Sequence, residues 1–205
     1  RDLHSFPTRR SSDLEPAYLF TGSLMHRDSE GNAIEIKPGA MNLMTAGRGI
    51  AHSERTPANV RENSSPLFGI QSWLALPRAH EETAPTFQRY EAQQLPVIED
   101  RGVRARVIAG SAFGKASPVT TLSDWLYVEV LLKAGASAPL DADHEERGIY
   151  VAEGAIEVAG EHFEAPQLLV FRPSDRITVT ATRDARLMFL GGAGMNAGSD
   201  RKSVV

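Results

Sequence analysis

The sequence predicts an all-β protein that contains two barrels or sandwiches. Short stretches of alternating or β-branched residues recur along the 205 residues. They are separated by Gly, Pro, Asn and Asp turns, which is the pattern of antiparallel sheets. A five-residue stretch also recurs: Tyr18-Leu-Phe-Thr-Gly22 matches Tyr150-Val-Ala-Glu-Gly154 at an offset of 132, and each is followed by a strand and a proline. We therefore expect two copies of one β unit.

The first strands are expected in the run from Ala17 to Asp28, which ends at the turn Ser29-Glu-Gly-Asn32, and in the alternating Ala33–Lys37 before Pro38-Gly39. Later strands are expected at Leu67–Leu76, Val103–Ala109, Trp125–Leu132, Gly148–Val151, Ala155–Val158, Gln167–Phe171, Ile177–Thr180 and Ala185–Leu190. The proline-rich segment Pro77–Pro96 is expected to be a long connection or a short helix. Trp73 and Trp125 alternate with apolar neighbours, so we expect both in the core.

Composition excludes several classes of function. The net charge is −4, so the chain has no basic footprint for nucleic acid or an anionic membrane. It has no Cys, which excludes thiolate nucleophiles and Cys-ligated metals, so any metal would be held by His, Asp and Glu. No apolar run reaches the length of a membrane span and no signal peptide is evident. We expect a cytoplasmic protein.

The two ends read unlike the rest of the chain. His4–Leu14 reads HSFPTRRSSDL and Asp200–Val205 reads DRKSVV. Both can be back-translated into DNA sequences that are reverse complements of each other, and the first resembles a sequencing-library adapter. We therefore expect residues 1–14 and 200–205 to be adapter-derived rather than native, and exclude them from fold reasoning.

The densest candidate for chemistry is the run Met44-Thr-Ala-Gly-Arg-Gly-Ile-Ala-His-Ser-Glu54. His52 and Glu54 are two residues apart, so on a strand their side chains point to one face. Imidazole and carboxylate together suit Fe(II), Mn(II), Ni(II) or Cu(II), but the same spacing is common on a solvated strand face. Gly47-Arg-Gly49 precedes no helix and is interpreted as a tight bend rather than a phosphate loop.

The remaining candidates favour structural interpretations. His26 beside Arg27-Asp28 is interpreted as a strand-end residue with a local hydrogen bond rather than a ligand. The polar run Asp141–Glu146 is interpreted as a solvated turn, and His162 as a surface residue. No nucleophile triad can be assigned from the sequence.

Several runs resemble the pirin family: YLFTG, HRDSEGN, IKPGAMNLMTAGRGIAHSE, GIQSWLALP, RVIAGSAFGKASPV and IYVAEGAIEVAGE, which together cover most of residues 17–193. The resemblance implies two cupin domains (double-stranded β-helix or jelly-roll barrels). With residues 1–14 set aside as non-native, we expect a truncated N-terminal domain at 15–113, a C-terminal domain at 114–194 and a tail at 195–205, of which 200–205 is the second adapter-like segment. The resemblance also implies one metal, usually iron, in the first barrel, with Mn, Ni, Cu or Zn as alternatives.

In that family the metal has three His ligands and one Glu ligand. By motif match His52 and Glu54 are the last two. The first two form a His-x-His pair expected just upstream of Tyr18, and the sequence contains no such pair. We therefore expect the first barrel to be incomplete and to bind iron poorly as given.

The resemblance implies an activity like that of quercetin 2,3-dioxygenase, which opens a flavonol ring with O2. Glu54 would then be both ligand and proton acceptor. The alternative is a non-enzymatic, iron- or redox-sensing regulator of protein partners such as transcription factors. Fold alone does not decide between them. For the chain as given, the missing pair predicts an inactive fragment.

Overall fold

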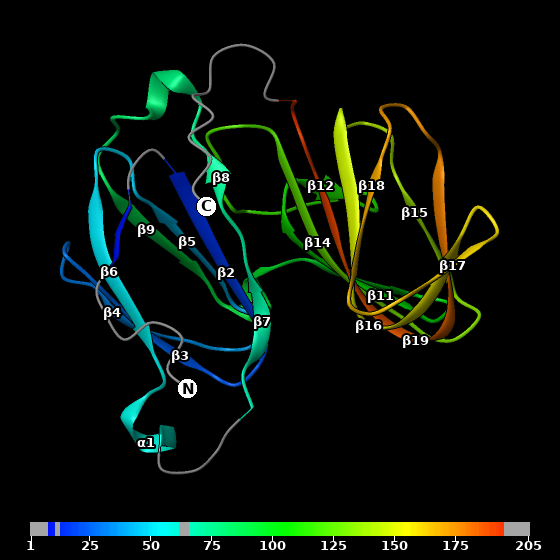
Figure 1. Ribbon diagram of the computed structural model, residues 1–205, viewed down its shortest axis with the longest axis horizontal. Coiled ribbons are helices and arrows are strands. Elements are labelled where there is room, and N and C mark those ends of the chain that lie inside the picture. Colours follow the sequence, from blue (N-terminus) through cyan, green and yellow to red (C-terminus); the bar gives the residue numbers. More distant parts are fainter. Residues whose placement is uncertain (1–7, 11–12, 62–65, 195–205) are drawn as a thin grey trace. The chain divides into compact units, whose positions relative to one another are not determined.

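The computed structural model describes residues 8–10, 13–61 and 66–194, with only the backbone described for 8–10. The chain divides into two compact units, 1–92 with 196–205 and 93–195. Antiparallel strands make up most of each unit (Figure 1). Among the described residues, no helix is long and apolar enough to cross a membrane.

The first unit contains two antiparallel sheets. One has the order β1-β6-β3-β4, and the other β7-β2-β5-β9 with β8 also paired to β2. The strands are β1 (Thr8–Arg10), β2 (Asp13–Thr21), β3 (Leu24–Asp28), β4 (Ala33–Ile36), β5 (Met41–Thr45), β6 (Ile50–Arg55), β7 (Phe68–Gln71), β8 (Leu74–Ala75) and β9 (Thr86–Tyr90). A short helix α1 (Ala58–Arg61) and the 3-10 turns η1 (Arg78–His80) and η2 (Ala92–Gln94) connect them.

The second unit is a larger sheet system of order β10-β11-β14-β19-β16-β17, in which β15 pairs with β19 and β18 pairs with β16. A small pair, β12 and β13, lies beside it. The strands are β10 (Val97–Asp100), β11 (Val103–Ala109), β12 (Ser111–Ala112), β13 (Lys115–Ala116), β14 (Trp125–Leu132), β15 (Ser137–Leu140), β16 (Glu146–Val158), β17 (Glu161–Glu164), β18 (Gln167–Phe171) and β19 (Ile177–Gly192).

The all-β prediction is confirmed, and three predicted strands have the predicted bounds: β11, β14 and β18. The segment 77–96 was expected to lack a strand but contains β9, which pairs with β5. Trp125 is buried as expected. The prediction for Trp73 is wrong, because 53% of its surface is exposed.

The unit boundary follows from strand pairing. The sequence-based division stood between 113 and 114, whereas the compact units divide between 92 and 93. Val97–Asp100 and Val103–Ala109 form a ladder that continues onto β14, so both strands pack with the second unit.

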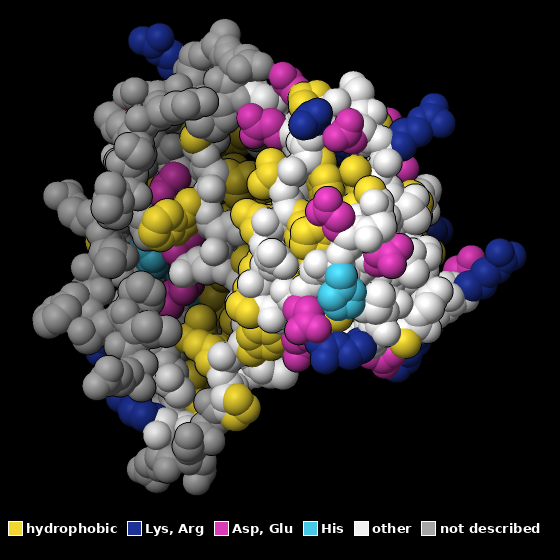
Figure 2. Space-filling view, turned by 45° about the vertical axis from the view of Figure 1, so that its right-hand side comes forward, with side chains coloured by type: hydrophobic (Ala, Val, Ile, Leu, Met, Phe, Trp, Pro, Cys, Tyr) yellow, Lys and Arg dark blue, Asp and Glu magenta, His cyan; other side chains and the backbone are white. Residues whose placement is uncertain are grey.

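The surface of the second unit mixes charge signs. In Figure 2, which turns the β17 side forward, acidic and basic side chains lie among hydrophobic ones. Leu168 and Val170 on β18 are among the exposed large hydrophobics, at 56% and 77%.

Candidate functional site in the first barrel

Strand β6 presents His52 and Glu54 on one face, as their spacing predicts. The turn before it needs glycine: Gly47 has φ +52°, and a Cβ there would lie 2.1 Å from the carbonyl oxygen of Thr83. This tight turn, closed by the 2.9 Å hydrogen bond from the Gly49 N–H to the Ala46 carbonyl, leads directly into β6. The interpretation of Gly47-Arg-Gly49 as a bend is consistent with these angles and contacts.

Strand β3 brings a second pair to the same place. In the antiparallel register His26 lies opposite Glu54, and Asp28 lies opposite His52. Residues directly opposite each other share one face of a sheet, so the four side chains form a two-by-two array. All four are nearly buried: the side chains of His26, Asp28, His52 and Glu54 are 1%, 0%, 5% and 8% exposed.

His26 lies between two carboxylates. Its Nε2 is 3.1 Å from Asp28 Oδ2, and its Nδ1 is 3.5 Å from Glu54 Oε1. Burial opposes charging of the ring, but the hydrogen bonds and charges of Glu54 and Asp28 outweigh it and raise the pKa of His26 above its ordinary value. Burial likewise opposes ionisation of Asp28, yet hydrogen bonds from Asn32 and His26 lower the pKa of its carboxyl group.

The array faces the interior between the two sheets of the first unit. The ring of His26 is 4.6 Å from that of Phe87 on β9, and His52 Nε2 is 3.6 Å from Oε2 of the buried Glu15 on β2. Gln71, the last residue of β7, donates from Nε2 to Glu54 Oε2 at 2.8 Å. Because Gln71 is exposed, this is the side of the array that solvent reaches.

A divalent metal fits this array in donor chemistry but not in donor number. Nδ1 of His52 is buried and has no hydrogen-bond partner among the described residues, as is typical of an imidazole that can bind an ion. Within those same residues, however, no three or more His, Asp or Glu side chains converge as a set of metal ligands. The described part of the chain thus supplies two candidate ligands, His52 and Glu54, and not a whole centre.

The second barrel carries apolar residues at the positions that match His26, Glu54 and Gln71. The offset of 132 places Tyr18 and Tyr150 at equivalent points, and the strand registers extend the match along both ladders. His26 opposite Glu54 becomes Val158 opposite Val179. Gln71, which lies opposite Ala17, becomes Phe189, which lies opposite Ile149. The polar array is therefore specific to the first barrel.

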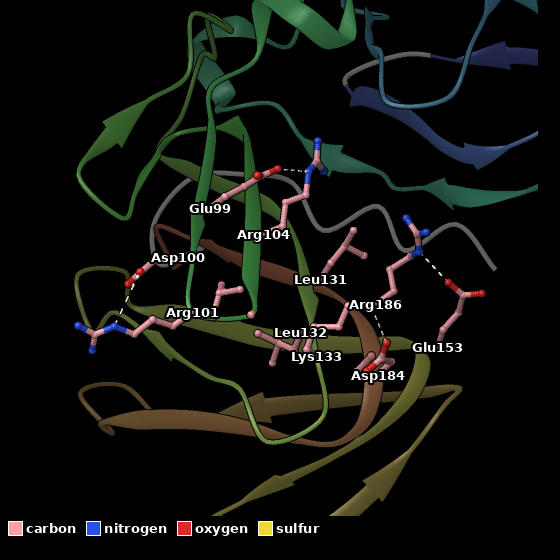
Figure 3. Close-up of a pocket in the computed structure, with 13 residues that line it drawn as sticks. Glu99, Asp100, Arg101, Arg104, Leu131, Leu132, Lys133, Glu153, Asp184 and Arg186 are labelled. Atoms are coloured by element: carbon pink, nitrogen blue, oxygen red, sulfur yellow. Dashed lines mark hydrogen bonds and ion pairs between the residues drawn. The ribbon is translucent and has the colours of Figure 1, made fainter.

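A pocket of about 850 Å³ in the second unit is the main alternative location. Figure 3 shows acidic and basic side chains around it that contact each other. The pairs are Glu99 with Arg104, Asp100 with Arg101, Lys133 with Asp184 and Glu153 with Arg186. Each acid faces a base, so the lining offers no uncompensated charge that would select a ligand.

Of the remaining sequence interpretations, two are confirmed and the one for His26 was incomplete. His162 is exposed and Asp141–Glu146 is mostly exposed turn, as expected. His26 does form the expected local hydrogen bond with Asp28, but it is also buried against Glu54. The repeated spacing His-x-Asp and His-x-Glu was a signal for this second pair. Glu15 and Gln71 carried no local signal, because their contacts cross from one sheet to the other.

Comparisons with known proteins agree with the fold and the motifs. The family model Pirin matches residues 3–74, and the Pirin C-terminal cupin domain matches residues 127–198. A pirin-like protein of Caulobacter vibrioides is 40% identical over 193 residues, covering 89% of this chain and 67% of the relative. A Pseudomonas aeruginosa relative, whose name carries a provisional assignment as a quercetin 2,3-dioxygenase, is 34% identical, covering 88% and 56%.

A solved structure of quercetin 2,3-dioxygenase from Acinetobacter baumannii superposes with a TM-score of 0.87 at 26% identity, covering 96% of this chain and 70% of that one. The chain thus spans 56% to 67% of the length of the two curated relatives named. The matches cover both barrels, and the 40% identical relative extends along nearly the whole chain. The chain belongs to the pirin family and has its two cupin domains.

Proposed function

We propose that the protein is a metal-dependent dioxygenase of the quercetin 2,3-dioxygenase type, acting on a flavonol-like small molecule with O2. The observation that carries the proposal is the buried array of His52, Glu54, His26 and Asp28, confined to the first barrel. The equivalents of His26 and Glu54 in the second barrel, Val158 and Val179, are packed in an apolar core, so the fold does not require this pair. Relatives named for this activity support the reaction class.

Two residues would hold the ion, which we propose is Fe(II). His52 offers a buried imidazole nitrogen, and Glu54 a carboxylate on the same face of β6. The upstream His-x-His pair implied by the family motif would supply the remaining ligands. When bound, the ion supplies Lewis-acid polarisation of the flavonol oxygen.

Glu54 is also suited to accept a proton. One carboxylate oxygen faces His26, and the other accepts from Gln71 at the solvent side. A flavonol entering from that side would present its hydroxyl group to the Glu54 carboxylate, which would take the hydroxyl proton and leave the flavonol oxygen anionic. The apolar wall at Phe87 would face the aromatic rings of the substrate.

The test measures bound metal by elemental analysis and oxygen-dependent loss of quercetin. It compares the 205-residue chain with a longer version in which residues 1–14 are replaced by an upstream segment whose strand carries the His-x-His pair. We expect the longer version to bind metal and consume quercetin. His52→Ala and Glu54→Gln should abolish turnover, whereas the control His162→Ala in the second barrel should not.

Metal binding without turnover by the longer version would contradict the dioxygenase proposal and favour a regulator of protein partners. Tight stoichiometric iron binding by the 205-residue chain would contradict the expectation that the missing pair is needed.

A further inference from the structure

We propose that His26 and Gln71 are positioning residues that hold the two carboxylate oxygens of Glu54 from opposite sides. His26 Nδ1 is 3.5 Å from Oε1, and Gln71 Nε2 donates to Oε2 at 2.8 Å. The ion-pair contact of His26 and the hydrogen bond of Gln71 come from different sheets of the first barrel, from β3 and β7 respectively. Their role in catalysis rests on the proposed function, whereas their hold on the carboxylate does not.

His26 and Gln71, which we call the Glu54 clamp, fix the direction in which the Glu54 carboxylate presents its lone pairs. The Glu54 side chain has three rotatable bonds and would otherwise sample several rotamers. The Gln71 hydrogen bond and the His26 ion-pair contact, made from separate strands, select one of them. Groups that orient a metal ligand or a catalytic carboxylate in this way typically change affinity or activity by 10–100-fold when removed. Neither residue needs to touch the substrate to have this effect.

His26 is itself held in place. Asp28 Oδ2 lies 3.1 Å from His26 Nε2, and the same carboxylate accepts the backbone N–H of Glu30 and of Asn32 at 3.0 Å each. The side-chain amide of Asn32 adds a third donor at 2.8 Å. The turn after β3 therefore fixes Asp28, Asp28 fixes the ring, and the ring meets Glu54.

The second barrel shows that these contacts are not needed for folding. At the equivalent positions it has Val158, Val179 and Phe189, all packed in its apolar core. The same strand ladder therefore forms with no donor and no carboxylate. A purely structural role for the clamp predicts nothing beyond lost stability, whereas positioning predicts an effect on Glu54 itself.

The first readout tests the hold in the 205-residue protein without any metal. In isotope-labelled protein, Glu54→Gln should move the side-chain amide resonance of Gln71 and the ring-nitrogen resonances of His26. The matched residues Gln167 and His162, on strands of the second barrel, should not move. Unchanged resonances for Gln71 and His26 would overturn the clamp.

The second readout tests whether the hold matters for quercetin turnover in the longer version. Gln71→Leu, which keeps the side-chain size and removes the donor, should lower kcat by roughly 10–100-fold and leave KM nearly unchanged. His26→Val should lower kcat similarly, and His26→Gln, which keeps a donor, should restore part of it. The control Gln167→Leu should keep the wild-type kcat.

The outcomes are separable. A wild-type kcat in Gln71→Leu and His26→Val would overturn the positioning role even if the resonances move. A rise in KM alone would indicate substrate contact instead and would also overturn it. If the unmodified longer version consumes no quercetin, the proposed function fails, while the resonance shifts still decide whether the clamp exists.

Discussion

The two barrels share a strand ladder and differ in what fills it. In the second, the interior is one large aliphatic cluster that includes Val158, Val179 and Phe189. In the first, the matching positions hold His26, Glu54 and Gln71, and two of the apolar clusters among the described residues are built on Ala17, Leu19 and Ile36 and on Met44, Ala46 and Ile50. Since burial of apolar area is the main favourable term in folding, the second barrel has the composition of a structural domain.

The two barrels also differ in how they use a buried charged residue at one equivalent position. Glu15 and Arg147 are equivalent by the offset of 132, and both are buried. Arg147 donates to the carbonyl oxygens of Asp141, Arg172 and Asp175 at 2.8–3.2 Å, so it ties together the loops at its end of the second barrel. Glu15 instead turns toward His52. One barrel uses its buried charge to close loops, and the other adds it to the array.

This contrast teaches where function can be located in a duplicated fold. Buried titratable groups cost free energy unless they are paired, so a fold that works without them retains them for chemistry. Within the array, His26 lies between two carboxylates, and Asp28 accepts a hydrogen bond from Asn32. Exchanging residues between the barrels tests the contrast directly.

The largest effect is expected from placing a first-barrel residue in the second barrel. Val179→Glu puts a carboxylate opposite Val158 in a fully apolar interior, and an uncompensated buried charge costs about 3–5 kcal/mol. Urea unfolding followed by the amide resonances of each unit should show the second unit losing this much stability. The neighbouring exposed control Thr178→Glu should stay within about 0.5 kcal/mol. Equal losses for the two variants would contradict the contrast.

A smaller effect is expected at a feature that the two barrels share, the glycine that ends the repeated pentapeptide. Gly22 and Gly154 end the repeated pentapeptide with φ of +81° and +84°, and a Cβ at Gly154 would lie 2.1 Å from the Asp184 carbonyl oxygen. Gly154→Ala should cost about 2–4 kcal/mol, from the left-handed conformation plus backbone displacement. Gly160→Ala has φ +82° but open space around it, so it should cost only about 1–2 kcal/mol. The difference in urea midpoint between Gly154→Ala and Gly160→Ala measures the cost of the close approach to the Asp184 carbonyl. Equal midpoints would mean that this approach costs nothing.

The reciprocal exchange should be tolerated. The double variant His26→Val, Glu54→Val gives the first barrel the residues of the second at one paired position. Replacing a buried charged pair by apolar residues is often neutral or stabilising, so we expect a change within about 1 kcal/mol. Urea unfolding measures it. A loss as large as that of Val179→Glu would mean that the array is part of the first core.

The sequence predicted the fold more completely than the site. Short apolar runs between turn residues predicted β11, β14 and β18 to the residue, since the signal there is local. The long β16 and β19 were each predicted as two separate strands, with Gly154 taken as a turn between the two pieces of β16. In the structure these strands continue through register shifts between Val151 and Ile156.

The site was predicted only as far as local spacing reaches. His52 and Glu54 were found because a two-residue spacing on a strand is visible in the sequence. Gln71 and Glu15 reach the array across the barrel, and no sequence period reports a contact between sheets. The adapter-derived origin of residues 1–14 stays a prediction: the family match begins at residue 3, and Asp13 and Leu14 lie in β2.

The smallest effect is a pH dependence confined to the first unit. The raised pKa of His26 means that the folded state favours its charged form, so this stabilisation is fully present below about pH 6.5, the ordinary value for His, and is lost as pH rises through the raised one. The lowered pKa of Asp28 works oppositely: its contribution is fully present above about pH 3.9 and is lost as pH falls through the lowered value.

Both contributions are complete only between these limits, so the first unit should be most stable between about pH 4 and 6.5. Urea unfolding of each unit from pH 4 to 9 should show the free energy of unfolding of the first unit falling above this window by on the order of 1 kcal/mol. His26→Val, Glu54→Val should lose the decline, because it removes the ring and one of its carboxylates together. If the variant still lost stability above about pH 6.5, the pH dependence would come from groups other than His26. The second barrel has valines in place of this His–Glu pair, and its midpoint should stay flatter over the same range.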